Sequence, residues 1–372
     1  MNILFVHEVD WLRKVVYDPH MLAEAISLRK HNVYVLDYES MWGKNGNNQL
    51  TRVFDDASLK LVRTPFIKLP IVSRISAAVS QQFNMGKILK KYDIDAIVLY
   101  SVPTNGLQTL YWAKKYKIPV FFRSLDILHQ LVNITGLKTI TKVMERLVYS
   151  NIDVGLTITP TLSRYMKSMG AKHTMVLNMP VDTTKFKPYK SNIRNKWGIK
   201  NDDRVILFIG TLYNFSGLDM LIKNIHRLGS KLLIVGNGPQ FNDLERTIYK
   251  YRANGDVIIT GFQPYSDMPD YINTSDVCVL PFRNTPATND IFPGKLVQYL
   301  ACGKPVVTTP LMGIKEVMPE GTVTYAQGEV SFVHQIVNSY KHPINSTGLD
   351  YVKDNHCAFK VAERLEKIIY DW

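Results

Sequence analysis

The most informative stretch of this sequence reads Asp290-Ile291-Phe292-Pro293-Gly294-Lys295-Leu296-Val297-Gln298-Tyr299-Leu300-Ala301-Cys302-Gly303-Lys304-Pro305-Val306-Val307. Its Pro-Gly pair predicts a helix start, Gly303 predicts the helix end, and the residues after Pro305 predict a strand. Free backbone N–H groups, the helix dipole and Lys295 would then converge on an anion such as a phosphate. Gln298, three residues after Lys295, shares its helical face. The alternative is an ordinary helix and strand of an α/β domain.

The bulk composition predicts a folded protein with two domains. The chain has 372 residues, of which 46% are hydrophobic and 21% are charged, so it can bury more than one core. The apolar start at residues 3–6 is followed by His7 and Glu8, which predicts a buried strand and not a signal peptide. No apolar run reaches the length of a membrane span. We expect a cytoplasmic protein that can bind peripherally to the inner face of the cell membrane.

Part of the net charge of +13 lies in residues 57–92, which contain Lys and Arg but no Asp or Glu. Within this segment four apolar residues recur every fourth position and predict one helical face, with Gln81 turned elsewhere. They are Ile71, Ile75, Val79 and Phe83. We expect this basic amphipathic segment to contact an anionic membrane surface, and the alternative is packing of its apolar face into the domain. No nucleic-acid-binding motif accompanies the charge, so we expect no nucleic acid partner.

Short apolar segments alternate with helical patterns along most of the chain. In the first half the expected strands are residues 3–7, 32–37, 96–100, 120–123 and 155–158, and the expected helices are 19–30, 72–91, 107–117 and 139–150. After residue 190 the expected strands are 205–210, 231–236, 257–260, 277–281 and 305–309, and the expected helices are 218–227, 240–251, 265–273 and 295–302. Such alternation predicts an α/β protein with parallel sheets covered by helices.

Residues 178–188 form a connector, Asn-Met-Pro-Val-Asp-Thr-Thr-Lys-Phe-Lys-Pro, between these two cycles. The connector is similar to the Asn-Gly-Val-Asp-x-x-x-Phe-x-Pro hinge of family 4 glycosyltransferases, also called glycosyl transferases group 1. Residues 28–36, 208–222, 234–239 and 261–281 agree with that family in order and spacing, and Asp290-x7-Gln298 stands where it has Glu-x7-Glu. The chain therefore resembles retaining glycosyltransferases of the GT-B fold.

The resemblance implies a fold and a domain plan. The fold is GT-B, an α/β class with two Rossmann-like doubly wound parallel-sheet domains facing across a cleft. Residues 1–182 would form the acceptor-binding domain and residues 183–355 the nucleotide-sugar-binding domain. Residues 356–372 would form a final helix that packs back on the N-terminal domain.

The resemblance also implies donor-binding residues in the second domain. They are Gly210, Thr211, Gly236, Gly238, Phe262, Arg283, Phe292, Gly294, Lys295 and Gln298. The family has an Arg and a Lys where this chain has Thr211 and Ser216, so Lys295 and Arg283 remain as the candidates to neutralise a diphosphate. Arg283 could equally be a solvated loop residue, and Phe262, expected to support the base, could equally be a core aromatic residue.

Two further departures concern the paired acidic residues of the family motif. Gln298 replaces the second Glu, and its amide can still bind a pair of ribose hydroxyls, though without charge assistance. Asp290 replaces the first Glu as a catalytic candidate that contacts the transferred sugar, or it caps the helix that follows. Lys295 is the other catalytic candidate of this domain.

In the first domain the candidates follow strand ends, where α/β sheets present ligands. Asp126 and His129 follow residues 120–123, and His7 follows the first strand. The resemblance implies that Asp126 and His129 face the sugar and the acceptor. An isolated histidine can instead be a structural hydrogen-bonding residue, and that alternative stays open for each.

The implied activity is transfer of a sugar from a UDP- or GDP-linked donor to a hydroxyl of a glycan or polyprenyl-linked acceptor. Transfer would retain the anomeric configuration and serve cell-surface polysaccharide or glycolipid synthesis. No Asp-x-Asp motif stands at a strand end, and we expect no metal and no other cofactor. Because the family's Arg, Lys and both Glu residues are replaced, two alternatives stay open: a catalytically weak, transferase-like binding subunit and a nucleotide-sugar epimerase of the same fold.

Overall fold

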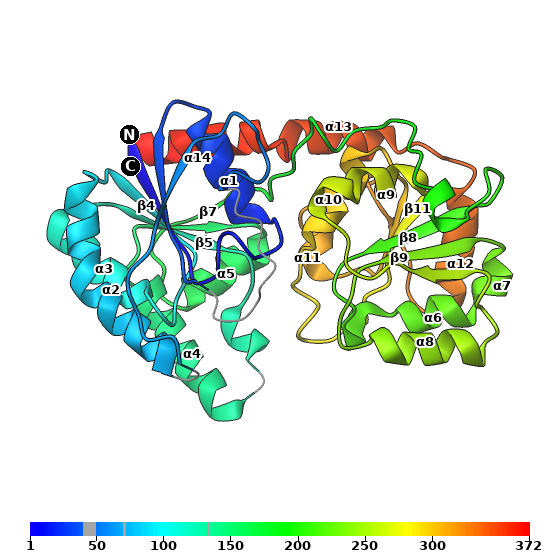
Figure 1. Cartoon of the computed structure of the whole chain (residues 1–372), viewed down its shortest axis with the longest axis horizontal. Coiled ribbons are helices and arrows are strands. Elements are labelled where there is room, and N and C mark those ends of the chain that lie inside the picture. The colour runs from blue at the N-terminus through cyan, green and yellow to red at the C-terminus, as the bar shows by residue number, and fades with distance from the viewer. Residues whose placement is uncertain (40–49, 70–71, 133) are drawn as a thin grey trace. The chain divides into compact units, whose positions relative to one another are not determined.

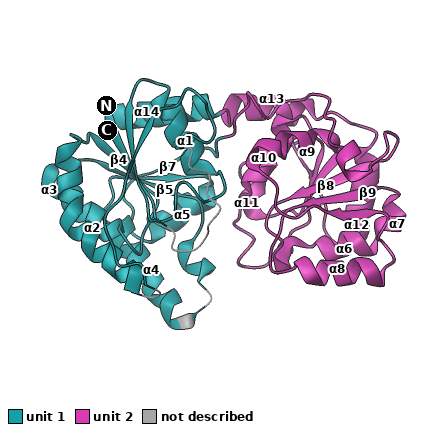
Figure 2. Cartoon of the chain, in the orientation of Figure 1, with its two compact units in different colours: residues 1–180, 358–372 teal, residues 181–357 magenta. Residues whose placement is uncertain are grey.

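The structure, a computed structural model, describes residues 1–39, 50–69, 72–132 and 134–372. These residues form two compact units (Figure 2). Unit 1 contains residues 1–180 and 358–372, and unit 2 contains residues 181–357. The boundaries expected from the sequence, after residues 182 and 355, lie in the same two connecting segments. Each unit has one sheet of parallel strands between helices, which confirms the predicted α/β class (Figure 1).

Unit 1 contains a seven-stranded parallel sheet with the order β3-β2-β1-β4-β5-β6-β7. The strands are β1 (Asn2–Val6), β2 (Asn32–Leu36), β3 (Leu59–Val62), β4 (Ala96–Leu99), β5 (Val120–Ser124), β6 (Val154–Thr157) and β7 (Thr174–Val176). Its helices are α1 (Asp18–Ser27), α2 (Val72–Lys91), α3 (Gly106–Tyr116), α4 (Thr135–Tyr149), α5 (Pro160–Ser168) and α14 (Ala358–Tyr370), with a 3₁₀ turn η1 (Leu128–Leu131). The strand order reverses between β1 and β4, where sheets of this kind bind ligands.

Unit 2 contains a six-stranded parallel sheet with the order β10-β9-β8-β11-β12-β13. Its strands are β8 (Val205–Ile209), β9 (Lys231–Val235), β10 (Val257–Ile259), β11 (Val277–Leu280), β12 (Val306–Thr308) and β13 (Thr324–Tyr325). Its helices are α6 (Leu218–Lys223), α7 (Ile225–Leu228), α8 (Phe241–Lys250), α9 (Met268–Thr274), α10 (Gly294–Ala301), α11 (Met312–Lys315), α12 (Glu329–Ser339) and α13 (Ser346–Asn355). Here the strand order reverses between β8 and β11.

The structure contains helices and edge strands that the sequence analysis did not predict. The helices are α5, α11, α12 and α13. β3, β7 and β13 were not expected, because these short edge strands lack the continuous apolar run of a buried parallel strand. The expected helix at residues 218–227 is divided into α6 and α7 at Asn224, whose amide donates to the Met220 carbonyl at 2.9 Å. A side chain that bonds its own helix backbone in this way interrupts the regular helix.

The structure of helix α2 contradicts the alternative that its apolar face packs into the domain. Its side chains Ile75, Val79 and Phe83 are 64%, 53% and 69% exposed, so the expected apolar face does not pack into the core. Ile71, the fourth residue of that pattern, lies outside the described residues. The buried face carries Ala77, Gln81 and Met85 instead, and Gly86 on the same side has room for no Cβ because the Trp112 ring of α3 lies against it. Small residues on this face let α2 pack closely on α3 and leave the large apolar side chains outside.

The last helix, α14, belongs to unit 1 and packs on α1. Glu366 of α14 pairs with Arg29, and its Oε1 lies 2.6 Å from Nε2 of His31. The ring of Phe359 lies against that of Phe54, with centroids 5.0 Å apart. Polar and aromatic contacts therefore tie the end of the chain to its first third.

A buried ion pair joins three separate segments of unit 1. The Arg123 and Asp18 side chains are fully buried, and the Arg123 Nε and Nη2 atoms lie 3.2 and 2.5 Å from the two Asp18 carboxylate oxygens. Arg123 also donates to the carbonyl groups of Leu177 and Asn178, and the Tyr100 hydroxyl donates to Asp18 at 2.8 Å. The pair thus connects the ends of β4 and β5 with the start of α1 and the segment after β7.

We predict that Arg123→Met destabilises the protein by about 3–5 kcal/mol, because the Asp18 carboxylate would remain buried without its cation. Arg246→Met is the matched control, since its partner Asp243 lies on the surface and an exposed pair contributes about 0–1 kcal/mol. Urea unfolding of both variants measures the difference. Equal midpoints for the two variants would contradict the structural role of Arg123.

Candidate functional site

Glycine residues bring the ends of β8 and β9 into direct backbone contact in unit 2. Gly210 and Gly236 have φ values of 133° and 148°, which side chains rarely allow. A Cβ on Gly236 would overlap the Gly210 carbonyl oxygen, and a Cβ on Gly238 would lie 2.6 Å from the Leu212 nitrogen. The backbone after β8 and β9 is therefore closely packed, and β8 is one of the two strands between which the strand order reverses.

The amino group of Lys295 lies against this backbone. A Cβ on Gly210 would collide with Nζ of Lys295, and the same nitrogen lies 4.3 Å from the centroid of the Phe208 ring and 5.4 Å from that of Phe282. Burial lowers the pKa of the Lys295 amino group to about 7. No carboxylate forms an ion pair with it among residues 1–39, 50–69, 72–132 and 134–372. The Lys295 amino group thus lies against two aromatic rings, and none of the described carboxylates is its counterion.

The helix α10 begins beside this cation with its first N–H groups uncapped. Pro293 is the N-cap residue, and no side chain accepts a hydrogen bond there. Asp290 does not cap the helix, so the structural alternative for this residue is wrong. Its carboxylate accepts a bond from the Asn289 amide at 3.3 Å, and both residues are only partly buried. Gly294 opens the helix, and the half-buried Gln298 lies one turn further along it.

The residues expected to contact a donor occupy different environments. Thr211 is exposed next to Gly210, whereas Ser216 is buried and accepts a hydrogen bond from the Tyr213 N–H at 3.1 Å. Arg283 is an exposed residue whose Nη2 donates to Asp219 at 2.9 Å, and its own N–H donates to the Phe215 carbonyl. Arg283 therefore lies beside the loop between β8 and α6, but it already has a carboxylate partner.

The two phenylalanine residues expected to contact the donor, Phe262 and Phe292, differ in their exposure to solvent. Phe262 is 68% exposed, so the core alternative for this residue is wrong, and its neighbour Gly261 pairs with Gly236 through an isolated bridge. The Phe262 ring is therefore available at the end of β10. Phe292 is buried, and its ring stacks on that of His356 at a centroid distance of 5.9 Å. We correct its assignment from ligand contact to packing within unit 2.

Unit 1 contains a pocket of about 440 Å³ at the carboxyl ends of β1, β4 and β5. Asp126 lines it, and burial raises the pKa of its carboxyl group to about 6. In the part of the chain that the structure describes, this carboxylate makes no hydrogen bond. Lys14 and Tyr17 line the same pocket.

His7 lines this pocket as a neutral imidazole, and each of its two ring nitrogens has a hydrogen-bond partner. Its Nδ1 accepts a bond from the Val9 N–H at 2.9 Å, and its Nε2 lies 2.6 Å from the Tyr17 hydroxyl. Burial, aided by repulsion from His20, lowers the pKa of His7 to about 3. His7 therefore orients Tyr17, a site residue that sequence reasoning missed. The signal that could have found it is its position in the loop between the first strand and the first helix.

His129 does not reach the pocket. It is buried, with Nδ1 2.7 Å from Oε2 of Glu145, and the Tyr165 hydroxyl donates to the same carboxylate oxygen at 2.9 Å. Glu145 also accepts a bond from the Leu128 N–H at 2.9 Å. These bonds fix η1 on α4, so we correct His129 from a catalytic candidate to a structural residue.

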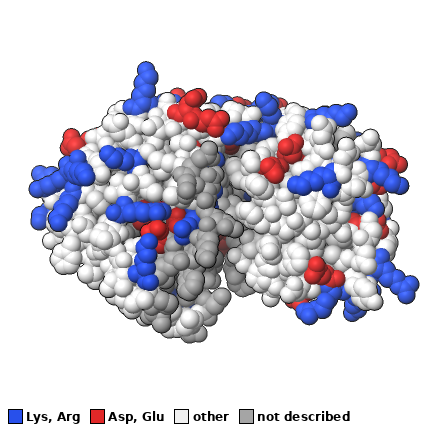
Figure 3. Space-filling model, in the orientation of Figure 1, with Lys and Arg blue, Asp and Glu red and all other residues white. Residues whose placement is uncertain are grey.

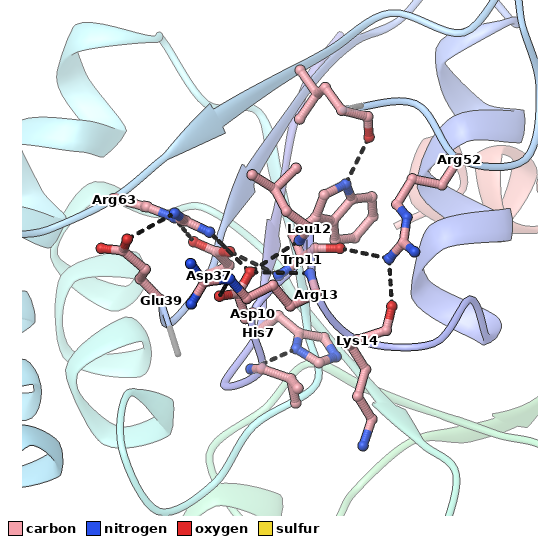
Figure 4. Close-up of polar contacts among 12 residues, drawn as sticks. His7, Asp10, Trp11, Leu12, Arg13, Lys14, Asp37, Glu39, Arg52 and Arg63 are labelled. Carbon is pink, nitrogen blue, oxygen red and sulfur yellow. Dashed lines mark hydrogen bonds and ion pairs between the residues drawn. The ribbon is translucent and has the colours of Figure 1, made fainter. Parts of the chain in front are cut away.

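A second polar network in unit 1 involves residues that follow the ends of β1 and β2 (Figure 4). Arg63 Nε and Nη2 lie 2.7 Å from the two carboxylate oxygens of Asp37, and Nη2 lies 3.1 Å from Asp10. Lys68 Nζ lies 2.6 Å from Glu39. The network therefore engages two of the cations of residues 57–92 with carboxylates from the rest of unit 1.

The described parts of the chain contain no group of three His, Cys, Asp or Glu side chains placed to hold a metal ion. Nor does any helix in these parts have the length and apolar character needed to cross a bilayer. Figure 3 shows Lys and Arg side chains interspersed with Asp and Glu on the face in view, with wide uncharged areas between them.

Comparison with known sequences finds similarity that includes most of the second unit. Residues 203–341 match the sequence model of the family described as Glycosyl transferases group 1. The GPI3 subunit of phosphatidylinositol N-acetylglucosaminyltransferase from Saccharomyces cerevisiae is 28% identical over 193 residues, which are 50% of this chain and 40% of that protein. A GDP-mannose-dependent alpha-(1-6)-phosphatidylinositol monomannoside mannosyltransferase from Mycolicibacterium smegmatis is 30% identical over 43% of this chain and 45% of its own length. The chain thus spans less than half the length of these relatives.

Comparison with solved structures covers both units. HepE of Anabaena, solved in complex with UDP-glucose, matches with a TM-score of 0.77 at 16% identity, over 100% of each chain. At this identity the likeness concerns the fold, and it confirms the predicted GT-B architecture.

We predict that Lys295→Met stabilises the unliganded protein, by on the order of 1–3 kcal/mol at pH 6. A lysine whose pKa is lowered by burial binds fewer protons in the folded state between pH 7 and 10.5, so the stability of the parent rises with pH over that range. The advantage of the variant should therefore shrink towards pH 10. Denaturant unfolding at pH 6, 8 and 10 measures this, and a variant that is less stable at pH 6 would assign Lys295 a structural role.

Proposed function

Since residues 203–341 match the sequence model of the glycosyl transferases group 1 family, we propose that this chain transfers a sugar from a nucleoside diphosphate donor to a hydroxyl of a glycan or lipid-linked acceptor. The observation that carries the proposal is the unpaired cation of Lys295 beside Gly210 and the uncapped start of α10. A diphosphate supplies the counterion that this site lacks. Binding it would raise the pKa of Lys295 and restore its full charge.

The donor lies at the ends of β8, β9 and α10 in this proposal. Its diphosphate contacts Lys295 and the backbone N–H groups at Gly294, where the helix dipole also favours negative charge. Gln298 binds the ribose hydroxyls and the exposed Phe262 ring supports the base. Asp290 accepts a hydrogen bond from a hydroxyl of the transferred sugar. UDP and GDP sugars are the donor classes to test, and no step requires a metal.

The proposed reaction retains the anomeric configuration. The bond between the anomeric carbon and the diphosphate oxygen breaks while the acceptor oxygen bonds to the same face of that carbon. The departing phosphate oxygen takes the acceptor proton, so the chemistry depends on stabilising the diphosphate more than on a side-chain base. Lys295 would supply that stabilisation, and the Asp126 pocket of unit 1 would orient the acceptor hydroxyl.

We place the enzyme peripherally on an anionic membrane surface, for which unit 1 has two supporting features. Lys87, Lys90 and Lys91 are exposed at the end of α2 and take no part in the carboxylate network described around Arg63. Helix α4 also carries an exposed apolar stripe, which the sequence analysis did not single out. The α4 stripe consists of Leu137, Ile140, Val143 and Leu147, which are between 47% and 56% exposed. Exposed Lys138, Lys142 and Arg146 accompany it, as in helices that lie in a bilayer interface.

We predict that Lys295→Met lowers the rate of sugar transfer about a hundredfold, the usual effect of removing one charge-assisted contact to a leaving group. The assay uses a panel of UDP and GDP sugars with release of the free nucleotide as the readout. Lys250→Met, at an exposed position of α8, is the matched control and should behave as the parent does. Donor binding without any turnover in the parent would favour the binding-subunit alternative.

For the membrane contact we predict two separable effects on vesicle sedimentation. Lys87→Gln with Lys90→Gln and Lys91→Gln should reduce binding to anionic vesicles at low salt and have little effect at high salt, because salt screens these charges. Ile140→Asn with Val143→Asn should reduce binding at both salt concentrations, because it removes apolar area. Val330→Asn in unit 2 is the control at a 71% exposed valine. Equal sedimentation of all variants would refute the membrane contact.

A further inference from the structure

An open apolar groove of about 790 Å³ lies between α2 and the segment that leads into α3. Its walls include Ile75, Val79 and Phe83, the large apolar side chains that α2 turns away from the core. Pro103 and Gln108 line the opposite side. The positions from residue 75 to residue 83 extend about 12 Å along the helix, at about 1.5 Å per residue. Side chains of this size stay outside a core only at a cost, so their grouping around one groove indicates an apolar occupant.

The groove adjoins the Asp126 pocket. Glu8 and Pro103 line both of them, so the apolar walls lie next to the polar pocket. Glu8 is fixed at this junction, because its Oε1 accepts the Thr104 N–H at 2.7 Å. Arg74 lies on the groove side and donates to the Glu8 carbonyl at 3.1 Å, with its guanidinium 4.1 Å from the centroid of the Tyr38 ring.

The two cavities together present a polar end and an apolar end to one ligand. Asp126, Tyr17 and Lys14 offer acceptors and donors for hydroxyl groups at the polar end. Val79 and Phe83 offer only hydrocarbon surface at the other end. A free glycan would leave the groove empty, whereas a hydroxyl-bearing head joined to an alkyl chain would fill both.

We propose that the groove along α2 binds the apolar chain of a lipid-linked acceptor whose hydroxyl-bearing head occupies the Asp126 pocket. The inference rests on the proposed function and narrows its acceptor to an amphipathic molecule. The α2 groove holds a single chain, whereas the α4 stripe contacts the bilayer from which such an acceptor would enter. Leu131 of η1, 59% exposed, lines the Asp126 pocket and precedes the α4 stripe along the chain.

The test uses n-alkyl β-D-glucosides as monomeric probes, below the concentrations at which they form micelles. Calorimetry on the full chain should show affinity rising from the hexyl through the octyl to the decyl glucoside, by at least tenfold overall, because each buried methylene group raises affinity up to about fourfold. Methyl glucoside should bind too weakly to detect. An affinity that does not depend on chain length would overturn the proposal.

Matched variants test whether the alkyl chain of the probe binds in the α2 groove. Val79→Asn with Phe83→Asn, both at exposed positions that leave the core intact, should abolish the dependence on chain length. Ile140→Asn with Val143→Asn and the unit 2 variant Val330→Asn should keep it. Loss of the dependence in the α4 variant as well would show general adsorption to apolar surface and reject the groove. Binding of UDP and GDP, measured on the same proteins, reports the donor site separately, so its failure would count against the proposed function and not against the groove.

Discussion

Direct contact between two stretches of backbone sets the geometry of unit 2. The Gly210 carbonyl occupies the space in which any other residue at position 236 would carry its Cβ. The amino group of Lys295 lies beside this contact, where a Cβ on residue 210 would stand. The cation lies against the rings of Phe208 and Phe282, and no carboxylate in the described parts of the chain pairs with it, so it stays available to an anion. The candidate donor site therefore lies beside the closely packed backbone that follows β8 and β9.

In unit 1 the strand ends are held together by a buried ion pair and not by contact between glycine residues. The pair consists of Arg123 and Asp18, and Arg123 also bonds the segment after β7. Arg123 and Asp126 line the same pocket, and among the residues described Asp126 is a carboxylate without a hydrogen-bond partner there. A rigid, fully bonded frame beside an unsatisfied group is the arrangement that orients a hydroxyl ligand.

The sequence predicted the elements of both sheets better than the direction in which individual side chains point. Buried parallel strands leave long apolar runs, and helix starts leave Pro-Gly pairs, so most of β1 to β12 and α10 could be located. Periodicity could not tell which face of α2 is buried, because Ala77 and Gln81 pack inward only through the close approach of α2 to Trp112 of α3. His129 and Phe292 were misassigned for a similar reason. Their partners, Glu145 and His356, come from other elements, and their contacts cannot be read from local spacing.

The position of α14 has a consequence for synthesis of the chain. Unit 1 is discontinuous in sequence, since residues 181–357 intervene between its seventh strand and its last helix. Glu366, the partner of Arg29 and His31, is made more than three hundred residues after them. During translation, the surface of α1 that α14 covers must therefore stay open until unit 2 has been made. A ribosome that stalls within unit 2 would leave this surface of α1 exposed, so we expect the nascent first unit to bind chaperones.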